Sequence, residues 1–169
     1  MLDVAESLQK EKDVHFLFVG EGAVKSKLIE LTEKKQLQNV TFMSGQLREK
    51  VSNFYHLADV CLVPLSNVPG LSTFIPSKMF EIMGCGKPII AALRGESADI
   101  LTKSSASLVI PPENPEELIS AIKELKNDSD RCRRMGQNGR SFVENHYDRK
   151  ILARKYLTIL ERVITSNEN

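Results

Sequence analysis

The sequence predicts an α/β fold, a doubly wound parallel sheet of about five to six strands with helices on both faces and a helical C-terminus. Short apolar runs rich in β-branched residues alternate with longer segments of helical periodicity. The runs are apolar at successive positions, which is typical of strands covered on both faces. The connections are short, and a short connection through a helix brings consecutive strands together in parallel.

Five strands are expected, over residues 14–19, 39–43, 59–63, 88–91 and 107–110. Gly20 ends the first of them directly. His15 lies inside that first run, and we expect it to pack in the core. After Ile110 no further strand is expected, because the rest of the chain has helical periodicity.

Eight helices are expected, over residues 1–10, 23–37, 48–57, 77–84, 96–104, 115–127, 130–145 and 148–165. The clearest start is at Asn114, an N-cap residue that is followed by Pro115 and by two acids in the first turn. The last helix has an apolar stripe that includes Tyr156, Ile159 and Val163.

Length and composition are those of one globular domain. The chain has 169 residues, of which 41% are hydrophobic and 27% charged, so it can bury a continuous core. The amphipathic segment 1–10 should follow a strand, and no strand precedes it in this sequence. We therefore expect a single domain over 1–169 that is truncated at its amino-terminal end.

The charge and cysteine content exclude several classes of function. The net charge is +1 with acidic and basic residues interleaved, so neither nucleic acid nor an anionic membrane is an expected partner. The three cysteines form no CxxC pair, which argues against a disulfide framework or a zinc site. No apolar run approaches the roughly 20 residues that span a bilayer. We expect a cytoplasmic protein without a metal or cofactor.

In an open parallel sheet, ligands bind beyond the carboxyl ends of the strands. Gly20 and Gly22 follow the first strand there and let a ligand approach the backbone, although an ordinary tight turn explains them equally well. Gly45 and Leu47 lie in the turn after the second strand. The third strand leads into the loop 64–75, which is longer than the usual connection of about 2 to 6 residues.

Residues 76–90 contain the most specific motif of the chain. They begin Pro-Ser-Lys-Met-Phe-Glu, continue into a small-residue-Gly helix end, and reach a Lys-Pro pair before a β-branched strand. This block resembles the signature of family 4 (group 1) retaining glycosyltransferases, and its Pro-Ser-Lys-x-Phe-Glu form is similar to that of bacterial amino-sugar transferases. The resemblance covers about residues 14–165 and implies the carboxy-terminal, donor-binding domain of the two-Rossmann-domain (GT-B) fold.

The resemblance implies a nucleotide-sugar site at the sheet edge. The glutamate matching Glu81 holds the nucleotide ribose in the family; its alternative role here is an ion pair with Lys78 at i,i+3. The helix start, Ser77 and Lys78 suit a diphosphate. Many relatives have a glutamate near the donor sugar where this chain has Thr73, so the sugar contact of that glutamate is not carried over to this chain. The predicted donor-binding residues are Gly20, Gly22, Gly45, Leu47, Gly70, Ser72, Thr73, Ser77, Lys78 and Glu81.

The implied activity is transfer of a sugar, with retention, from a nucleoside diphosphate sugar to an acceptor in surface polysaccharide or glycolipid synthesis, with UDP as the expected nucleotide. The resemblance assigns catalytic residues largely to an amino-terminal acceptor domain absent from this sequence, so the chain alone is expected to be inactive. It also implies that the helices over 130–166 contact that domain, and it allows a peripheral attachment of the full protein to the inner membrane face.

Three alternatives stay open at this point. A nucleotide-sugar 2-epimerase shares the architecture but needs carboxylates and a histidine near the cleft, where the loops offer Glu81 and Glu96. A flavodoxin-like binding or signalling module needs an acidic cluster after the first strand, where only Glu21 is found. Asp128-Ser129-Asp130 has the Asp-x-Asp form of metal-dependent glycosyltransferases, but we expect it to cap a helix.

Overall fold

Five parallel strands make up the sheet elements of the computed structural model, which describes residues 1–166. They are β1 (Phe16–Val19), β2 (Val40–Met43), β3 (Cys61–Pro64), β4 (Ile89–Ala92) and β5 (Ser107–Ile110). All five expected strands are confirmed. The expected domain ran to residue 169, and its positions 167–169 lie outside the described residues.

The strands form two hydrogen-bonded sets instead of one continuous ladder. β1 pairs with β2, and β3, β4 and β5 pair in that order, all in parallel. The carboxyl ends of the paired strands therefore lie at a common edge of each set.

All eight expected helices are present, at α1 (Leu2–Ser7), α2 (Lys25–Lys34), α3 (Arg48–Leu57), α4 (Lys78–Gly84), α5 (Glu96–Ser104), α6 (Pro115–Lys126), α7 (Ser129–His146) and α8 (Arg149–Ser166). A short 3-10 helix, η1 (Pro69–Thr73), lies in the long loop after β3 and was not predicted. The predicted cap at Asn114 is confirmed, since its side chain accepts from the Glu117 N–H at 3.1 Å. Asp128 likewise caps α7 and accepts from the Arg131 N–H at 2.8 Å.

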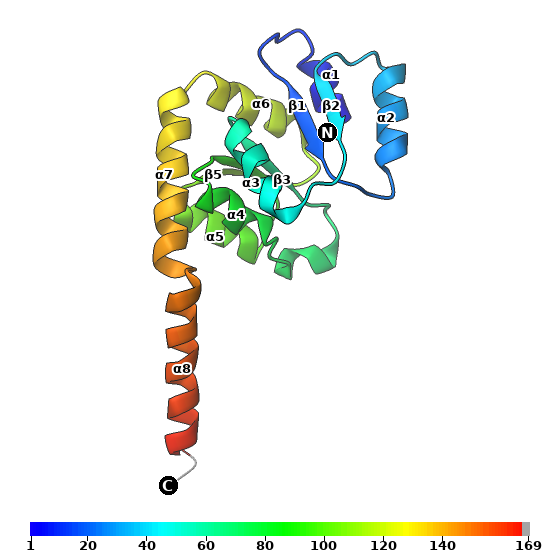
Figure 1. The fold of residues 1–169 in the computed structure, drawn as a ribbon. Helices are drawn as coiled ribbons and strands as arrows, with labels where there is room; N and C mark the ends of the chain where they lie inside the picture. Colours follow the sequence, from blue (N-terminus) through cyan, green and yellow to red (C-terminus); the bar gives the residue numbers. More distant parts are fainter. Residues whose placement is uncertain (167–169) are drawn as a thin grey trace.

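Two hydrophobic clusters lie on the two faces of the three-stranded set, and the cluster that contains α1 and α6 also includes side chains of β1 and β2. α6 lies on one side of this set, and α4 and α5 lie on the other (Figure 1). β4 divides its side chains between them: Ile90 and Ala92 enter the cluster with α1 and α6, and Ile89 and Ala91 enter the cluster with α4 and α5. This alternation is the period-two geometry of a strand buried on both faces. All four β4 side chains are buried, so β4 is the centre of the three-stranded set.

The carboxy-terminal helices differ in their packing. α7 packs on α4 and on the turn after it at two glycines. A Cβ added to Gly136 would lie 2.0 Å from the carbonyl oxygen of Gly86, just after α4, and one added to Gly139 would lie 3.1 Å from Met83 Cγ of α4 and 2.8 Å from Ala106 Cβ. α8 instead projects away from the body of the domain (Figure 1). Its apolar side chains are exposed, including Tyr156 at 64% and Ile159 at 56%. No helix among the described residues is long and apolar enough to cross a membrane.

The prediction that His15 packs in the core was wrong. His15 precedes the first residue of β1 and is exposed, with its Nε2 atom 2.8 Å from Thr41 Oγ1. The strand begins one residue later, at Phe16, which is the residue that enters the core. The apolar run in the sequence therefore starts before the buried part of the strand does.

Candidate functional site

The loops that follow β1 and β2 are joined by a polar network at the carboxyl edge of the sheet. Gly20 donates its N–H to the Met43 carbonyl at 3.2 Å. The Glu21 carboxylate accepts from Lys25 Nζ at 2.9 Å and from the Gly45 N–H at 3.0 Å. Lys25 also donates to the Met43 carbonyl at 3.1 Å. These bonds hold two neighbouring loops of the predicted site in one arrangement.

The network also determines which groups of these loops remain available to a ligand. The Gly45 N–H donates to Glu21 and is therefore not available to a ligand. The hydrogen bond from Lys25 holds the pKa of the Glu21 carboxyl below its usual range, so Glu21 stays a charged acceptor. Gly22 has open space where a side chain would be. Leu47, the residue before α3, is 64% exposed. The turn after β2 therefore presents the Leu47 side chain and its remaining backbone groups to solvent.

The long loop between β3 and α4 is anchored by residues that follow the next two strands. The Asn67 N–H donates to Glu113 Oε1, beyond β5, at 3.1 Å. The fully buried Ser97 hydroxyl, in α5, donates to the Phe74 carbonyl at 2.6 Å. These anchors position Gly70, which has open space at its Cα, and the exposed Thr73, whose hydroxyl donates to the Gly70 carbonyl at 3.3 Å.

Gly95 is a third anchor of this loop and was not predicted from the sequence. Its φ of +75° and ψ of −149° lie in a region that is almost exclusive to glycine. A Cβ at this position would lie 2.0 Å from the Ser72 carbonyl oxygen. The η1 segment can therefore pack against the start of α5 only because residue 95 has no side chain. In the sequence, Gly95 is visible only as a glycine shortly after a buried strand. That position does not reveal that the residue contacts Ser72.

The start of α4 presents its first two backbone donors to solvent. The Met79 and Phe80 N–H groups are used in bonds to the Pro76 and Ser77 carbonyls, both at 3.1 Å. In the part of the chain that the structure describes, no bond involves the N–H groups of Ser77 and Lys78, and both side chains are exposed. Desolvation lowers the pKa of the Lys78 ammonium, and no carboxylate contributes to this shift.

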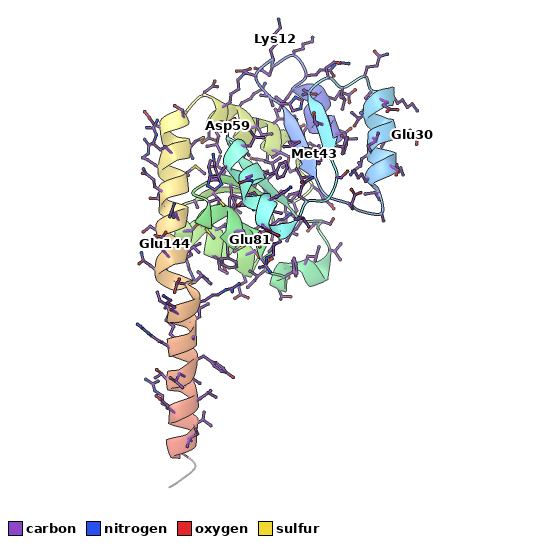
Figure 2. The ribbon with its side chains drawn as sticks, in the orientation of Figure 1. Lys12, Glu30, Met43, Asp59, Glu81 and Glu144 are labelled. Atoms are coloured by element: carbon purple, nitrogen blue, oxygen red, sulfur yellow. The ribbon has the colours of Figure 1, made fainter. Side chains whose placement is uncertain are left out.

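Glu81 is exposed and lies one turn into α4 (Figure 2). The Tyr55 hydroxyl, from α3, donates to Glu81 Oε2 at 3.4 Å. The alternative role, an ion pair with Lys78, is not found among the described residues. Burial, and after it the Glu81 charge, raises the pKa of Tyr55 to about 12, so this phenol stays a hydrogen-bond donor at neutral pH.

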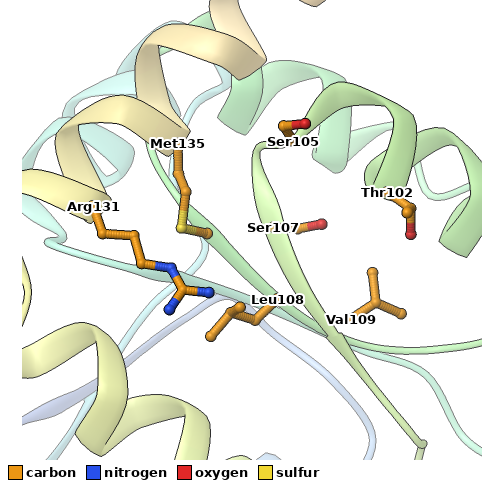
Figure 3. A pocket seen from close by; sticks show the side chains of 7 residues that line it. All are labelled: Thr102, Ser105, Ser107, Leu108, Val109, Arg131 and Met135. Atoms are coloured by element: carbon orange, nitrogen blue, oxygen red, sulfur yellow. The ribbon is translucent and has the colours of Figure 1, made fainter.

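Two features outside this edge are excluded as the donor site. The Asp128-Ser129-Asp130 triplet is occupied by helix capping and by an ion pair of Asp130 with Arg133 at 2.7 Å. A depression of about 460 Å³ lies beside β5 and α7 (Figure 3). The Arg131 side chain that lines it is already paired with Glu124. Its lining residues are Thr102, Ser105, Ser107, Leu108, Val109, Arg131 and Met135. Neither feature is formed by the loops that begin at the carboxyl ends of the strands.

Comparison with protein families matches residues 1–142 to the model of glycosyl transferases group 1. Among curated proteins, a GDP-mannose-dependent phosphatidylinositol monomannoside mannosyltransferase of Corynebacterium glutamicum is 28% identical over 155 residues, which are 88% of this chain and 39% of the relative. The lipopolysaccharide core biosynthesis glycosyltransferase LpsD of Rhizobium meliloti is 22% identical, over 92% of this chain and 44% of its own length. The chain thus spans about two fifths of these relatives.

Solved glycosyltransferases share the fold. The sucrose-phosphate synthase of Thermosynechococcus elongatus superposes with a TM-score of 0.79 at 22% identity, over 98% of this chain and 42% of that protein. Anabaena HepE, solved in complex with UDP-glucose, has a TM-score of 0.77 at 16% identity, over 95% of this chain and 44% of its own. The α/β architecture with its helical C-terminus is thereby matched to GT-B structures.

Proposed function

Because this chain belongs to the glycosyl transferases group 1 family, we propose that it forms the nucleotide-sugar donor site of a retaining glycosyltransferase. The observation that carries the proposal is the arrangement at the start of α4. There an exposed Glu81 carboxylate, bonded to Tyr55, lies one turn from the unpaired N–H groups of Ser77 and Lys78.

The chemistry of these groups fits a nucleoside diphosphate. Unpaired N–H groups at a helix start attract anionic oxygens, and the Lys78 ammonium adds a positive charge that no carboxylate of the described chain neutralises. We assign the diphosphate to Ser77 and Lys78 and the ribose hydroxyls to Glu81. A carboxylate accepts hydrogen bonds from two hydroxyls, and charge-assisted bonds of this kind are stronger than neutral ones.

The remaining predicted residues complete the proposed site. Leu47 packs against the face of the base, and the turn around Gly45 contacts its edge. The loops at Gly20 and Gly22 and at Gly70, Ser72 and Thr73 approach the diphosphate and the sugar. UDP is the proposed nucleotide, in line with its presence in several structural neighbours, although one curated relative is named for GDP-mannose.

The reaction we propose for the full-length protein uses this site to stabilise its leaving group. As the glycosidic bond to the donor breaks, negative charge grows on the diphosphate, and preorganised donors lower the barrier to that step. Acceptor and catalytic groups belong to an amino-terminal domain, and the exposed apolar side of α8 contacts that domain. The fragment alone binds nucleotide weakly and transfers no sugar. We assign the protein to polysaccharide or glycolipid synthesis in the cytoplasm, with an amino sugar or hexose as the transferred group.

A nucleotide titration followed by two-dimensional NMR of the labelled chain tests this proposal. UDP should shift the amide signals of Gly22, Ser77 and Lys78, while ADP and FMN should not. A response to FMN alone would support a flavodoxin-like module, and an equal response to GDP would overturn the choice of base. Turnover by this chain alone would contradict the assignment of catalysis to another domain.

Glu81→Gln tests the ribose contact, because it keeps the shape of the side chain and removes its charge. We expect about a tenfold weaker affinity for UDP, from the loss of a charge-assisted hydrogen bond. Glu30→Gln, on the exposed helix α2 far from α4 (Figure 2), is the matched control and should leave the affinity unchanged. Equal effects of the two changes would refute the role of Glu81.

A further inference from the structure

The described residues with a positive φ angle fall into two groups. One group ends a helix, which is a usual place for a left-handed residue: Gln36 after α2, Gly86 after α4 and Ser105 at the end of α5. The other group lies in the loops that follow strands: Gly20 after β1, Gly95 after β4 and Glu113 after β5. Helix termination therefore does not explain the backbone of Gly95 and Glu113.

Gly95 and Glu113 contact the same loop, the segment 67–74 that follows β3. A Cβ at Gly95 would lie 2.0 Å from the Ser72 carbonyl oxygen, so the two backbones are in contact there. Glu113 Oε1 accepts from the Asn67 N–H at 3.1 Å, at the other end of the segment. Two residues with unusual backbone angles, each after a different strand, thus hold a third loop.

The φ of +60° at Glu113 is unfavourable for a residue that has a Cβ. A glycine at this position would remove the steric cost, but it would leave the Asn67 N–H without its acceptor. Strained residues persist only where their surroundings hold them, and they are concentrated at active sites and ligand clamps. The backbone of Glu113 therefore indicates a function for the contact that its carboxylate makes.

The segment 67–74 depends on such anchors because hydrophobic burial does not hold it. Leu65 and Ile75, on its two sides, pack against the core. None of the described side chains between them is buried. The position of the segment is therefore set by backbone and polar contacts, which come from the loops after β4 and β5.

We propose that Gly95 and Glu113 are positioning residues for the transferred sugar, and that they act by holding the segment 67–74 in place. This inference rests on the proposed function, in which Gly70, Ser72 and Thr73 of this segment approach the sugar. The ribose and the base are assigned to Glu81 and Leu47, which lie outside the segment. The two anchors therefore affect binding of a nucleotide sugar more than binding of the free nucleotide.

The first test compares Glu113→Ala with Glu113→Gln in titrations with UDP, UDP-glucose and UDP-N-acetylglucosamine. In the parent chain, at least one nucleotide sugar should shift the Gly70 and Thr73 amide signals further than UDP does. Glu113→Ala lowers the fraction of molecules with the segment in place, so the affinity for that nucleotide sugar should fall about fivefold, while the affinity for UDP should stay within about twofold.

The conservative variant keeps the acceptor and should restore the parent behaviour. Glu113→Gln retains an Oε1 oxygen for the Asn67 N–H, so both affinities should match those of the parent chain. Amide exchange at Asn67 should be about tenfold faster in Glu113→Ala than in the parent chain and unchanged in Glu113→Gln.

Glu113→Gly separates positioning from stability. It relieves the left-handed backbone, so the urea midpoint of unfolding should not fall, although the affinity for the nucleotide sugar should fall as in Glu113→Ala. Ser105→Gly is the matched control, because Ser105 has a similar φ of +52° but lies at the end of α5. It should leave the urea midpoint no lower and both affinities unchanged.

Gly95→Ala is a stronger perturbation of the same loop. Its Cβ would collide with backbone atoms of Ser72, which no rotamer change relieves, so the segment must move. The affinity for the nucleotide sugar should fall to that for UDP. If this variant does not fold, the Glu113 variants still decide the proposal.

The proposal is overturned if Glu113→Ala lowers the affinities for UDP and the nucleotide sugar equally, or lowers neither. It is also overturned if Glu113→Gln fails to restore binding, or if neither nucleotide sugar shifts the segment in the parent chain. Failure of the parent chain to bind UDP would instead refute the proposed function, which this inference requires.

Discussion

Gly136→Ala is the sharpest test of the packing that joins α7 to α4. The added Cβ would lie 2.0 Å from the Gly86 carbonyl oxygen and 2.8 Å from the Gly86 carbonyl carbon. Both are backbone atoms, so no rotamer change relieves the contact, and the helix must move by more than an ångström. Overpacking of this kind costs about 3 kcal/mol, at the upper end of its usual range.

Part of that cost is offset, because alanine favours a helix interior over glycine by about 1 kcal/mol. We expect a net loss of about 2 kcal/mol of unfolding free energy, which lowers the Tm of a domain of this size by about 4–8 °C. The chain has no tryptophan, so urea unfolding is followed by far-ultraviolet circular dichroism. An unchanged m-value would show that the loss is one of native stability.

Gly84→Ala is the matched control, since it lies in the last position of α4 and has nothing within 4 Å of an added Cβ. It should be neutral or stabilising by up to about 1 kcal/mol. If both variants unfold at the same urea concentration as the parent chain, the close approach of α7 to Gly86 is not a feature of the molecule in solution.

Three further predictions concern single side chains. Folding raises the pKa of Tyr55 from 10.0 to about 12, so the stability that this shift contributes is complete below pH 10 and is lost as the pH rises to 12. Between pH 10 and 12, the Tm of the parent chain should therefore fall more than the Tm of Tyr55→Phe. Ser97→Ala leaves the Phe74 carbonyl without its partner, so it should lower the free energy of unfolding by about 1–3 kcal/mol and speed amide exchange across residues 67–74. Ser26→Ala, an exposed position of α2, is the control and should change neither quantity. Asp128→Ala removes the cap of α7 and should cost about 1 kcal/mol in urea unfolding. Asp130→Ala breaks an exposed ion pair and removes a first-turn charge, and it should cost less than about half of that; equal losses would contradict the capping role.

The strands and helices were predictable from the sequence because their signals are local. Apolar runs and caps such as Asn114 depend on residues within a few positions of one another. The position of His15 was not predictable in this way, because an apolar run does not mark the residue at which burial begins. The division of the strands into two sets was not predictable either, since pairing depends on which edges meet.

The sequence suggested the residues proposed for the site, but it did not predict the contacts that hold them in place. The motif around Glu81 predicted an exposed carboxylate, but its partner Tyr55 comes from a different helix, α3, and no sequence motif connects the two residues. Gly95 and Glu113 anchor a loop that is more than twenty residues away in sequence. Contacts over such separations have no local pattern, so they become visible only once the chain is folded.

The junction of α7 and α8 connects the projecting helix, through one aromatic contact, to the helix that carries the proposed donor site. The two helices are separated at Tyr147, whose ring lies 4.5 Å from the ring of Phe80, the residue next to Glu81 in α4. Because packed interiors transmit strain, a displacement of α8 at this junction would be passed through these two rings to α4. A partner that displaces α8 would therefore also displace the helix that carries Glu81, so the geometry of the proposed donor site would depend on the orientation of α8.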